Sequence, residues 1–329
     1  MSVTLGLDIG GANIKAATSA GSALSVPFAL WKQPELLTAQ LGGIIARFTA
    51  VNRLAITMTG ELCDCFATRA VGVRFILNAV VQAAQDTPCW VYHTTGGWCN
   101  ASSSVEWESI AAANWHALAT LTGRYAPRGP ALLIDIGSTT TDMIPISDGV
   151  PVPVGRTDPT RLASGELVYC GVKRTPIAAV LPLGRVCAEL FATMHDCYSL
   201  TGEVPENAED SDTADGRPST QPHAVARLAR MLGGDADTIP MGQIHTLMND
   251  AINTQLDALE AAARRVLARM DGPPTLILSG SGEFLAQRLV RRLGLAGNHV
   301  LSLSAELGPA LAGCAPAYAV AVLAEERLQ

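Results

Sequence analysis

Two distant segments of the chain repeat one short pattern, and the repeat restricts the folds that are possible. The first is LGLDIGGANIKAAT, beginning at Leu5, and the second is LLIDIGSTTTDMIPI, beginning at Leu132. Each is an apolar run, then Asp-Ile-Gly, then small polar residues, then apolar residues again. This order predicts two β-strands joined by a tight turn. Asp8 and Asp135 are 135 − 8 = 127 residues apart, about one domain length, so we expect two related domains in tandem.

The remaining segments alternate between strand-like and helix-like patterns. RLAITMTGEL at 53–62 and TLILSGSGEFL at 275–285 are predicted as buried strands that run into turns. Helices are expected at 36–50, 74–84, 104–123, about 223–233 and about 241–270. Alternating strands and helices in both halves predict an α/β protein with mixed sheets flanked by helices.

A proline and glycine cluster at 127–130 is the expected domain boundary. It gives a first domain of 1–128 and a second of 129–306. Residues 203–222 are polar and interrupted by proline and glycine, which predicts a long loop that could act as a lid. The segment of about 307–329 is a candidate to pack back on the first domain.

Charge and cysteine content argue against some classes of protein, such as nucleic-acid-binding proteins. A net charge of −7 and a pI near 5.4, with no basic run, argue against nucleic acid or an anionic membrane as a partner. The eight cysteines form no Cys-x-x-Cys pair, which is typical of buried thiols in a reducing compartment. The N-terminus lacks the pattern of a signal peptide, so we expect a cytoplasmic protein. A chain with only 16% charged residues is compatible with a homodimer.

The two glycine turns are suited to binding phosphate. A glycine at a hairpin tip lets backbone N–H groups approach an anion, and a neighbouring aspartate can hold Mg²⁺ that bridges to the phosphate. Asp8 and Asp135 are therefore the predicted catalytic and metal-binding residues. The predicted phosphate-binding residues are Gly10, Gly11, Asn13 and Lys15 in the first copy, Gly137, Ser138, Thr139 and Thr140 in the second, and Gly280 and Gly282 in LILSGSGE.

With its third glycine turn, the pattern resembles the actin, sugar kinase and Hsp70 superfamily from Leu5 to about Ala324. This resemblance implies two ribonuclease-H-like domains with an active-site cleft between them. Fold alone does not fix the reaction.

Five further motifs are TMTGEL at 57–62, NWHALA at 114–119, DIGSTTTDMIPI at 135–146, GVKRTP at 171–176 and TADGRP at 213–218. Together they resemble one branch of the hydantoinase/oxoprolinase-like proteins, linked to tetrahydromethanopterin-dependent C1 transfer. The resemblance implies a role in methanofuran biosynthesis, as a transferase that joins an aminomethylfuran-methyl diphosphate to the phenol of a (glutamyl)tyramine or tyrosine-type acceptor. Diphosphate would leave, with Mg²⁺ assisting.

Other polar residues have both a functional and a structural interpretation. Glu61 is a candidate base for the phenol, or a turn carboxylate. Arg174 is a candidate anion ligand, or a salt-bridge partner. The other substrate-binding candidates, which could equally be surface residues, are Asp142, Asp215 and Arg217.

Two further groups are weaker candidates. Adjacent residues on a helix point about 100° apart, so His195, Asp196 and Cys197 are not expected to form a catalytic triad. Trp98, Trp107 and Trp115 are expected in the core or an interface, although one could stack on a substrate ring.

Two other functions remain open. One is an ATP-dependent small-molecule kinase, or a hydantoinase/oxoprolinase-type enzyme that hydrolyses ATP. The other is a nucleotide-binding regulator without turnover. ATP is expected as a cofactor only under these alternatives.

Overall fold

Each copy of the repeat forms the hairpin that its sequence predicts, in a computed structural model that describes residues 3–103 and 106–328. Strand β1 (Val3–Ile9) pairs with β2 (Asn13–Thr18), and β7 (Pro130–Ile136) pairs with β8 (Thr141–Ser147). The tips close in the same way. The N–H of Gly10 donates to the carbonyl of Asn13 at 3.0 Å, and that of Gly137 donates to the carbonyl of Thr140 at 2.9 Å.

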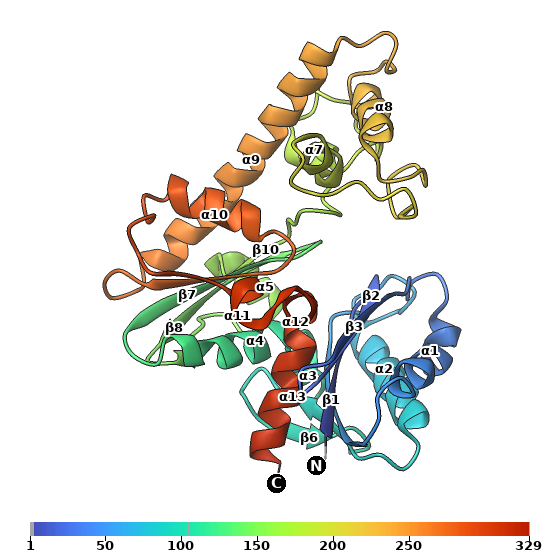
Figure 1. The fold of residues 1–329 in the computed structure, drawn as a ribbon, viewed down its shortest axis with the longest axis vertical. Coiled ribbons are helices and arrows are strands. Elements are labelled where there is room, and N and C mark those ends of the chain that lie inside the picture. The colour runs from blue at the N-terminus through green and yellow to red at the C-terminus, as the bar shows by residue number, and fades with distance from the viewer. Residues whose placement is uncertain (1–2, 104–105, 329) are drawn as a thin grey trace.

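The first hairpin lies in a mixed sheet of six strands. Its order is β3-β2-β1-β4-β5-β6, with β3 at Ala23–Pro27, β4 at Val51–Met58, β5 at Cys89–Tyr92 and β6 at Trp98–Asn100. Helices α1 (Leu37–Ile45) and α2 (Arg69–Ala84) cover one face (Figure 1). The strand predicted at 53–62 ends at Met58, because the next two amides turn to the carbonyl of Ile9.

The second hairpin lies in another mixed sheet, of order β10-β8-β7-β11-β12 with β9 beside β8. These added strands are β9 (Val150–Pro151), β10 (Leu167–Val168), β11 (Thr275–Ser279) and β12 (Val300–Ser302). Helices α9 (Met241–Leu267) and α10 (Glu283–Arg292) cover one face. The helices predicted at 223–233 and 241–270, and the strand, turn and helix at 275–285, are confirmed.

Helices α4 (Asn114–Thr122) and α13 (Ala315–Arg327) fill the space between the two sheets (Figure 1). Helix α13 packs on β1, and a Cβ at Gly6 would lie 1.9 Å from the carbonyl oxygen of Ala317. Helix α4 packs on the second sheet with one face and on α13 with another. Each half therefore supplies a helix to the other half's sheet, which joins the two firmly.

The helix predicted at 104–123 is two helices, α3 (Trp107–Ile110) and α4, separated near Ala112, whose φ is +46°. The first two residues of that prediction, 104 and 105, lie outside the described residues. The remaining short elements are η1 (Pro34–Leu36), η2 (Gly123–Tyr125), α5 (Asp158–Ser164), α6 (Ile177–Val180), α11 (Leu303–Leu307) and α12 (Pro309–Gly313).

The expected long loop lies between α7 (Met194–Leu200) and α8 (Gln221–Met231), in a group of helices on the far side of the molecule from β1 (Figure 1). Its ends are held together by the amide of Asn207, which donates to the carbonyl of Ser219 at 2.8 Å. No helix in the described part of the chain is long and apolar enough to cross a membrane.

Candidate active site

A cleft of about 950 Å³ lies between the two halves, and both hairpin tips line it. Asp8 and Asp135 are the last carboxylates before the two tips, and Gly280 of the third glycine turn lies beside Asp135. The structure therefore brings together three segments that are far apart in the sequence. The predicted residues that line the cleft are Asp8, Gly10, Gly11, Asn13, Lys15, Asp135, Gly137, Ser138, Thr139, Thr140, Asp142, Arg174 and Gly280.

The first tip directs its backbone carbonyls away from the cleft. The amide of Phe28 donates to the carbonyl of Ala12 at 2.9 Å, and the amide of Leu30 donates to that of Gly11 at 2.8 Å. Among the described residues, none accepts a hydrogen bond from the amides of Gly11 or Ala12. The tip thus keeps two N–H donors for an anion.

The second tip is supported in the same way by the GVKRTP segment. The amides of Lys173 and Arg174 donate to the carbonyl of Ser138 at 3.0 and 2.8 Å. A Cβ at Gly171 would lie 2.6 Å from the carbonyl oxygen of Gly137, so only glycine fits there. Within residues 3–103 and 106–328, no acceptor takes a hydrogen bond from the amide of Ser138.

Asp8 is buried, Asp135 is partly buried, and both lie near Lys15. Burial raises the pKa of Asp8 to about 6, and Lys15, its partner across the hairpin, acts in the opposite direction. Burial also raises the pKa of Asp135 to about 6, with Asp142 adding to the rise. Oδ1 of Asp8 is buried and has no hydrogen-bond partner in the described structure. Such a carboxylate oxygen is a ready ligand for a cation.

Gly280 and Gly282 have different roles. Gly280 has a φ of +88°, and a Cβ there would lie 2.3 Å from the carbonyl oxygen of Ile136 and 2.6 Å from Oδ1 of Asp135. Gly282 does not line the cleft, since its amide donates to Ile136 at 2.9 Å and it packs against Val172 at the start of α10. The prediction that Gly282 contacts phosphate is corrected to a packing role.

The structure also corrects the role of Glu61. Its carboxylate is buried outside the cleft lining and accepts hydrogen bonds from Nε and Nη2 of Arg69 at 2.9 and 2.7 Å. Arg69 in turn bridges to Asp158 in the other half at 2.8 Å. Glu61 is therefore an ion-pair partner at the contact between the halves, and not a base facing substrate.

Of the two candidates in the long loop, neither lines the cleft. Asp215 accepts a hydrogen bond from the buried Arg227 at 3.0 Å, and Arg217 is exposed. Their prediction as substrate-binding residues is corrected: Asp215 holds the loop on α8, and Arg217 contacts only residues of the loop itself. The loop reaches the cleft instead through Glu203, Val204, Pro205 and Asp210. Asp210 pairs there with Lys173 at 2.9 Å.

Asp142 does line the cleft, as its sequence position predicts, but its carboxylate is paired with Arg161. Arg161 is almost completely buried and lies 4.0 Å over the ring of Trp115. This pair places Asp142 as a support for the second hairpin.

Sequence reasoning missed several residues of the cleft. His195 lines it, with Nε2 2.6 Å from Oγ of Ser219, and burial lowers its pKa. As predicted, it forms no triad with its neighbours, since Asp196 pairs with Arg227. None of Trp98, Trp107 and Trp115 lines the cleft, whereas Trp31 does. Trp31 belongs to no recognisable motif, and its place in the cleft follows only from its contact with the distant Arg174.

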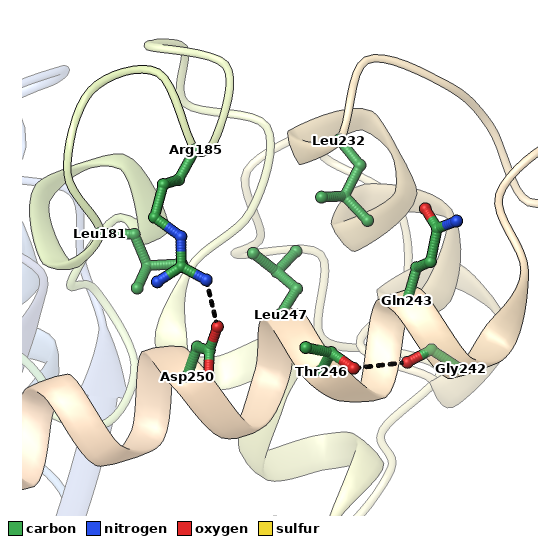
Figure 2. A pocket seen from close by; sticks show the side chains of 8 residues that line it. All are labelled: Leu181, Arg185, Leu232, Gly242, Gln243, Thr246, Leu247 and Asp250. Atoms are coloured by element: carbon green, nitrogen blue, oxygen red, sulfur yellow. Dashed lines mark hydrogen bonds and ion pairs between the residues drawn. The ribbon is translucent and has the colours of Figure 1, made fainter.

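A second pocket of about 340 Å³ lies at the first turns of α9 (Figure 2). Leu181, Leu232 and Leu247 line it together with the ion pair of Arg185 and Asp250. It contains none of the phosphate-binding candidates, and it is separate from the cleft.

Comparisons with known proteins identify the family and two relatives. A family model described as hydantoinase/oxoprolinase matches residues 53–327. A relative from Methanocaldococcus jannaschii is 27% identical over 98% of both chains, and one from Methanococcus vannielii is 25% identical over 60% of this chain and 91% of that protein. Both are named (4-{4-[2-(gamma-L-glutamylamino)ethyl]phenoxymethyl}furan-2-yl)methanamine synthase.

Among solved structures, nucleotide-free acetone carboxylase superposes with a TM-score of 0.58 at 10% identity, covering 97% of this chain and 70% of that chain. At this identity the likeness shows the fold alone. The two mixed sheets and their flanking helices confirm the expected α/β fold.

Proposed function

The chain belongs to the hydantoinase/oxoprolinase family, and we propose that it is a transferase of methanofuran-type cofactor biosynthesis. It would join an activated aminomethylfuran to the phenol of a glutamyltyramine-type acceptor. The observation that carries the proposal is the 27% identity over 98% of both chains to a synthase whose named product is a phenoxymethylfuran. That name describes an aryl ether on a furan methyl carbon.

The proposed reaction exchanges one bond for another. The bond from the furan methyl carbon to a diphosphate oxygen breaks, and a bond from that carbon to the phenol oxygen forms. The phenol proton passes to solvent, and diphosphate leaves with the electron pair of the broken C–O bond. Because a furfuryl-type carbon ionises readily, the main demand on the protein is to bind the negative charge that develops on diphosphate.

The cleft has the donors for this task. The tips of both hairpins keep backbone N–H groups without a protein acceptor among the described residues, and Lys15 adds a positive charge. Diphosphate bound between the tips would be held from both halves at once. This arrangement orients the bond that breaks and excludes water from part of the site.

The residues present fit a Mg²⁺ ion that arrives with the substrate. No group of three or more potential protein ligands occurs in the described residues, but Asp8 has a buried, unpartnered carboxylate oxygen and Asp135 lies nearby. Mg²⁺ is commonly held by one or two carboxylates plus substrate phosphates. When bound, the ion would neutralise charge on the leaving diphosphate.

The test is to incubate the protein with Mg²⁺, aminomethylfuran-methyl diphosphate and γ-glutamyltyramine. We expect phenol-dependent release of diphosphate and an ether product with the mass of the named compound. Formation of ADP from ATP would support the kinase or hydantoinase-type alternative instead. Saturable binding of ATP without any product would support the regulator.

An Asp135→Asn variant belongs in the same experiment. It removes one charge from the proposed metal site at nearly constant volume. We expect its turnover to fall by about 10²-fold or more, because a positioned charge in such a site contributes on this scale. An unchanged turnover would exclude Asp135 from the site.

A further inference from the structure

The cleft extends beyond the hairpin tips to a region with a different chemical character. Side chains from both halves line it, and we call this region the aromatic end: Trp31, Leu62, Cys63, Tyr169 and Arg174. Leu62 is 55% exposed and Tyr169 is 59% exposed. Large apolar side chains left open inside a cleft are typical of a site that an apolar group covers.

Arg174 gives the aromatic end one strong polar group. Its guanidinium lies 4.7 Å from the centroid of the Trp31 ring, and these residues come from different halves of the molecule. Its Nη1 is buried and makes no hydrogen bond within the described residues. No carboxylate in that part of the chain forms an ion pair with it. A charge held in this way is available to a ligand.

The aromatic end adjoins both phosphate tips. Sγ of Cys63 lies 2.8 Å from the position that a Cβ on Gly11 would occupy. On the other side, the amide of Arg174 donates to the carbonyl of Ser138 at 2.8 Å. A ring bound in the aromatic end would therefore lie next to a diphosphate held between the tips.

We propose that the aromatic end binds the phenol ring of the acceptor, with Arg174 facing the phenol oxygen. The ring would pack against Trp31, Leu62 and Tyr169, which provide aromatic and aliphatic surface. A guanidinium beside the phenol oxygen favours the phenolate, which is the attacking form. This inference rests on the proposed function and assigns Arg174 a substrate-binding role in it.

The first experiment separates acceptor binding from donor binding. We expect Leu62→Ala and Tyr169→Ala each to raise KM for γ-glutamyltyramine by about fivefold to tenfold, the scale of one lost aromatic or aliphatic contact, and to leave KM for the diphosphate donor unchanged. Leu183→Ala is the matched control, because Leu183 is 83% exposed and lies outside the cleft. A rise in donor KM alone would overturn the proposal, since the furan would then occupy the aromatic end.

The second experiment tests the role of Arg174 through acceptors of graded acidity. In Arg174→Met the loss of rate should be largest with unsubstituted tyramine-type acceptors and smallest with ring-fluorinated ones, whose phenols ionise more easily. Arg174→Lys, which keeps the charge, should recover part of this rate. Equal losses across the whole acceptor series would overturn the assignment of Arg174 to the phenol oxygen.

Direct titration of γ-glutamyltyramine into the protein, without donor, keeps this inference distinct from the proposed function. If wild-type protein releases no diphosphate yet binds the phenol, and Leu62→Ala and Tyr169→Ala weaken binding, the reaction is wrong but the aromatic end is a phenol site. If turnover occurs and the variants bind phenol as tightly as wild type, the aromatic end is not the acceptor site.

Discussion

Replacing the members of the ion pair between Glu61 and Arg69 tests whether Glu61 has a structural or a catalytic role. The side chain of Glu61 is 0% exposed and that of Arg69 is 18% exposed. In Arg69→Met, Glu61 would remain buried without its partner, and removing one member of such a pair costs about 3 kcal/mol. The low end of the usual range applies because Arg69 is partly in contact with water. In Glu61→Gln the amide oxygen still accepts from Arg69, so we expect about 1–2 kcal/mol.

These free energies convert into shifts of the melting temperature. At about 2.1 cal/mol/K per residue, a chain of 329 residues has an unfolding entropy of about 0.7 kcal/mol/K. Arg69→Met should then lower Tm by about 4 °C, and Glu61→Gln by about 2 °C. The control is Arg264→Met, which breaks the exposed pair with Glu260 on α9 and should cost about 0.5 kcal/mol, or less than 1 °C.

The assay combines thermal unfolding, followed by circular dichroism, with turnover measured as diphosphate release. If Glu61 is only an ion-pair partner, kcat of Glu61→Gln should stay within about tenfold of wild type at a temperature where both proteins are folded. Loss of a general base would lower kcat by about 10²–10⁴-fold. An unchanged Tm together with a loss of kcat on that scale would refute the structural role that we assign to Glu61.

Three further predictions follow from the site. Because the folded-state pKa of Asp8 is about 6 against 3.8 for the ordinary group, its contribution to stability should fall as pH rises from about 4 to 6, and the melting temperature of Asp8→Asn should depend less on pH over that range. Adding Mg²⁺ with inorganic diphosphate at pH 7 should raise the Tm of wild-type protein, and an equal shift in Asp8→Asn would count against Asp8 as a ligand. Gly280→Ala should destabilise the protein by more than about 2 kcal/mol, since its Cβ would lie 2.3 Å from a carbonyl oxygen. Gly184→Ala has a similar φ, +86°, with open space around it, so it should cost only about 1 kcal/mol, and equal Tm losses in the two variants would contradict the steric argument.

Much of the fold could be predicted because it rests on local patterns. Around Asp8 and Asp135, consecutive residues specify a strand, a turn and a second strand, and both hairpins form as expected. The long helix α9 follows equally from its periodicity. The position of α4 could not be predicted, because an apolar helix face fits either sheet and only the path of the chain decides between them.

The candidate site also contains residues that the local sequence predicts and residues whose roles depend on packing. The residues at the two tips lie in the cleft because hairpin geometry fixes them relative to their strands. Glu61 was misassigned because a carboxylate at the end of a strand looks the same in sequence whether it faces substrate or an arginine. The role of Asp215 likewise depends on its ion pair with Arg227 of α8, which the residues next to Asp215 in the chain do not reveal.

By itself, the sequence determined that this protein has two glycine-tipped hairpins, each with an aspartate, since strand pairing across a short turn depends on neighbouring residues only. Tertiary structure alone decided that Trp31 meets Arg174, that Arg69 joins Glu61 to Asp158, and that α13 covers β1. These contacts join residues that are distant in the chain. Their selection depends on how whole sheets and helices pack, and burial fixes which polar groups must find a partner and which remain available to a ligand.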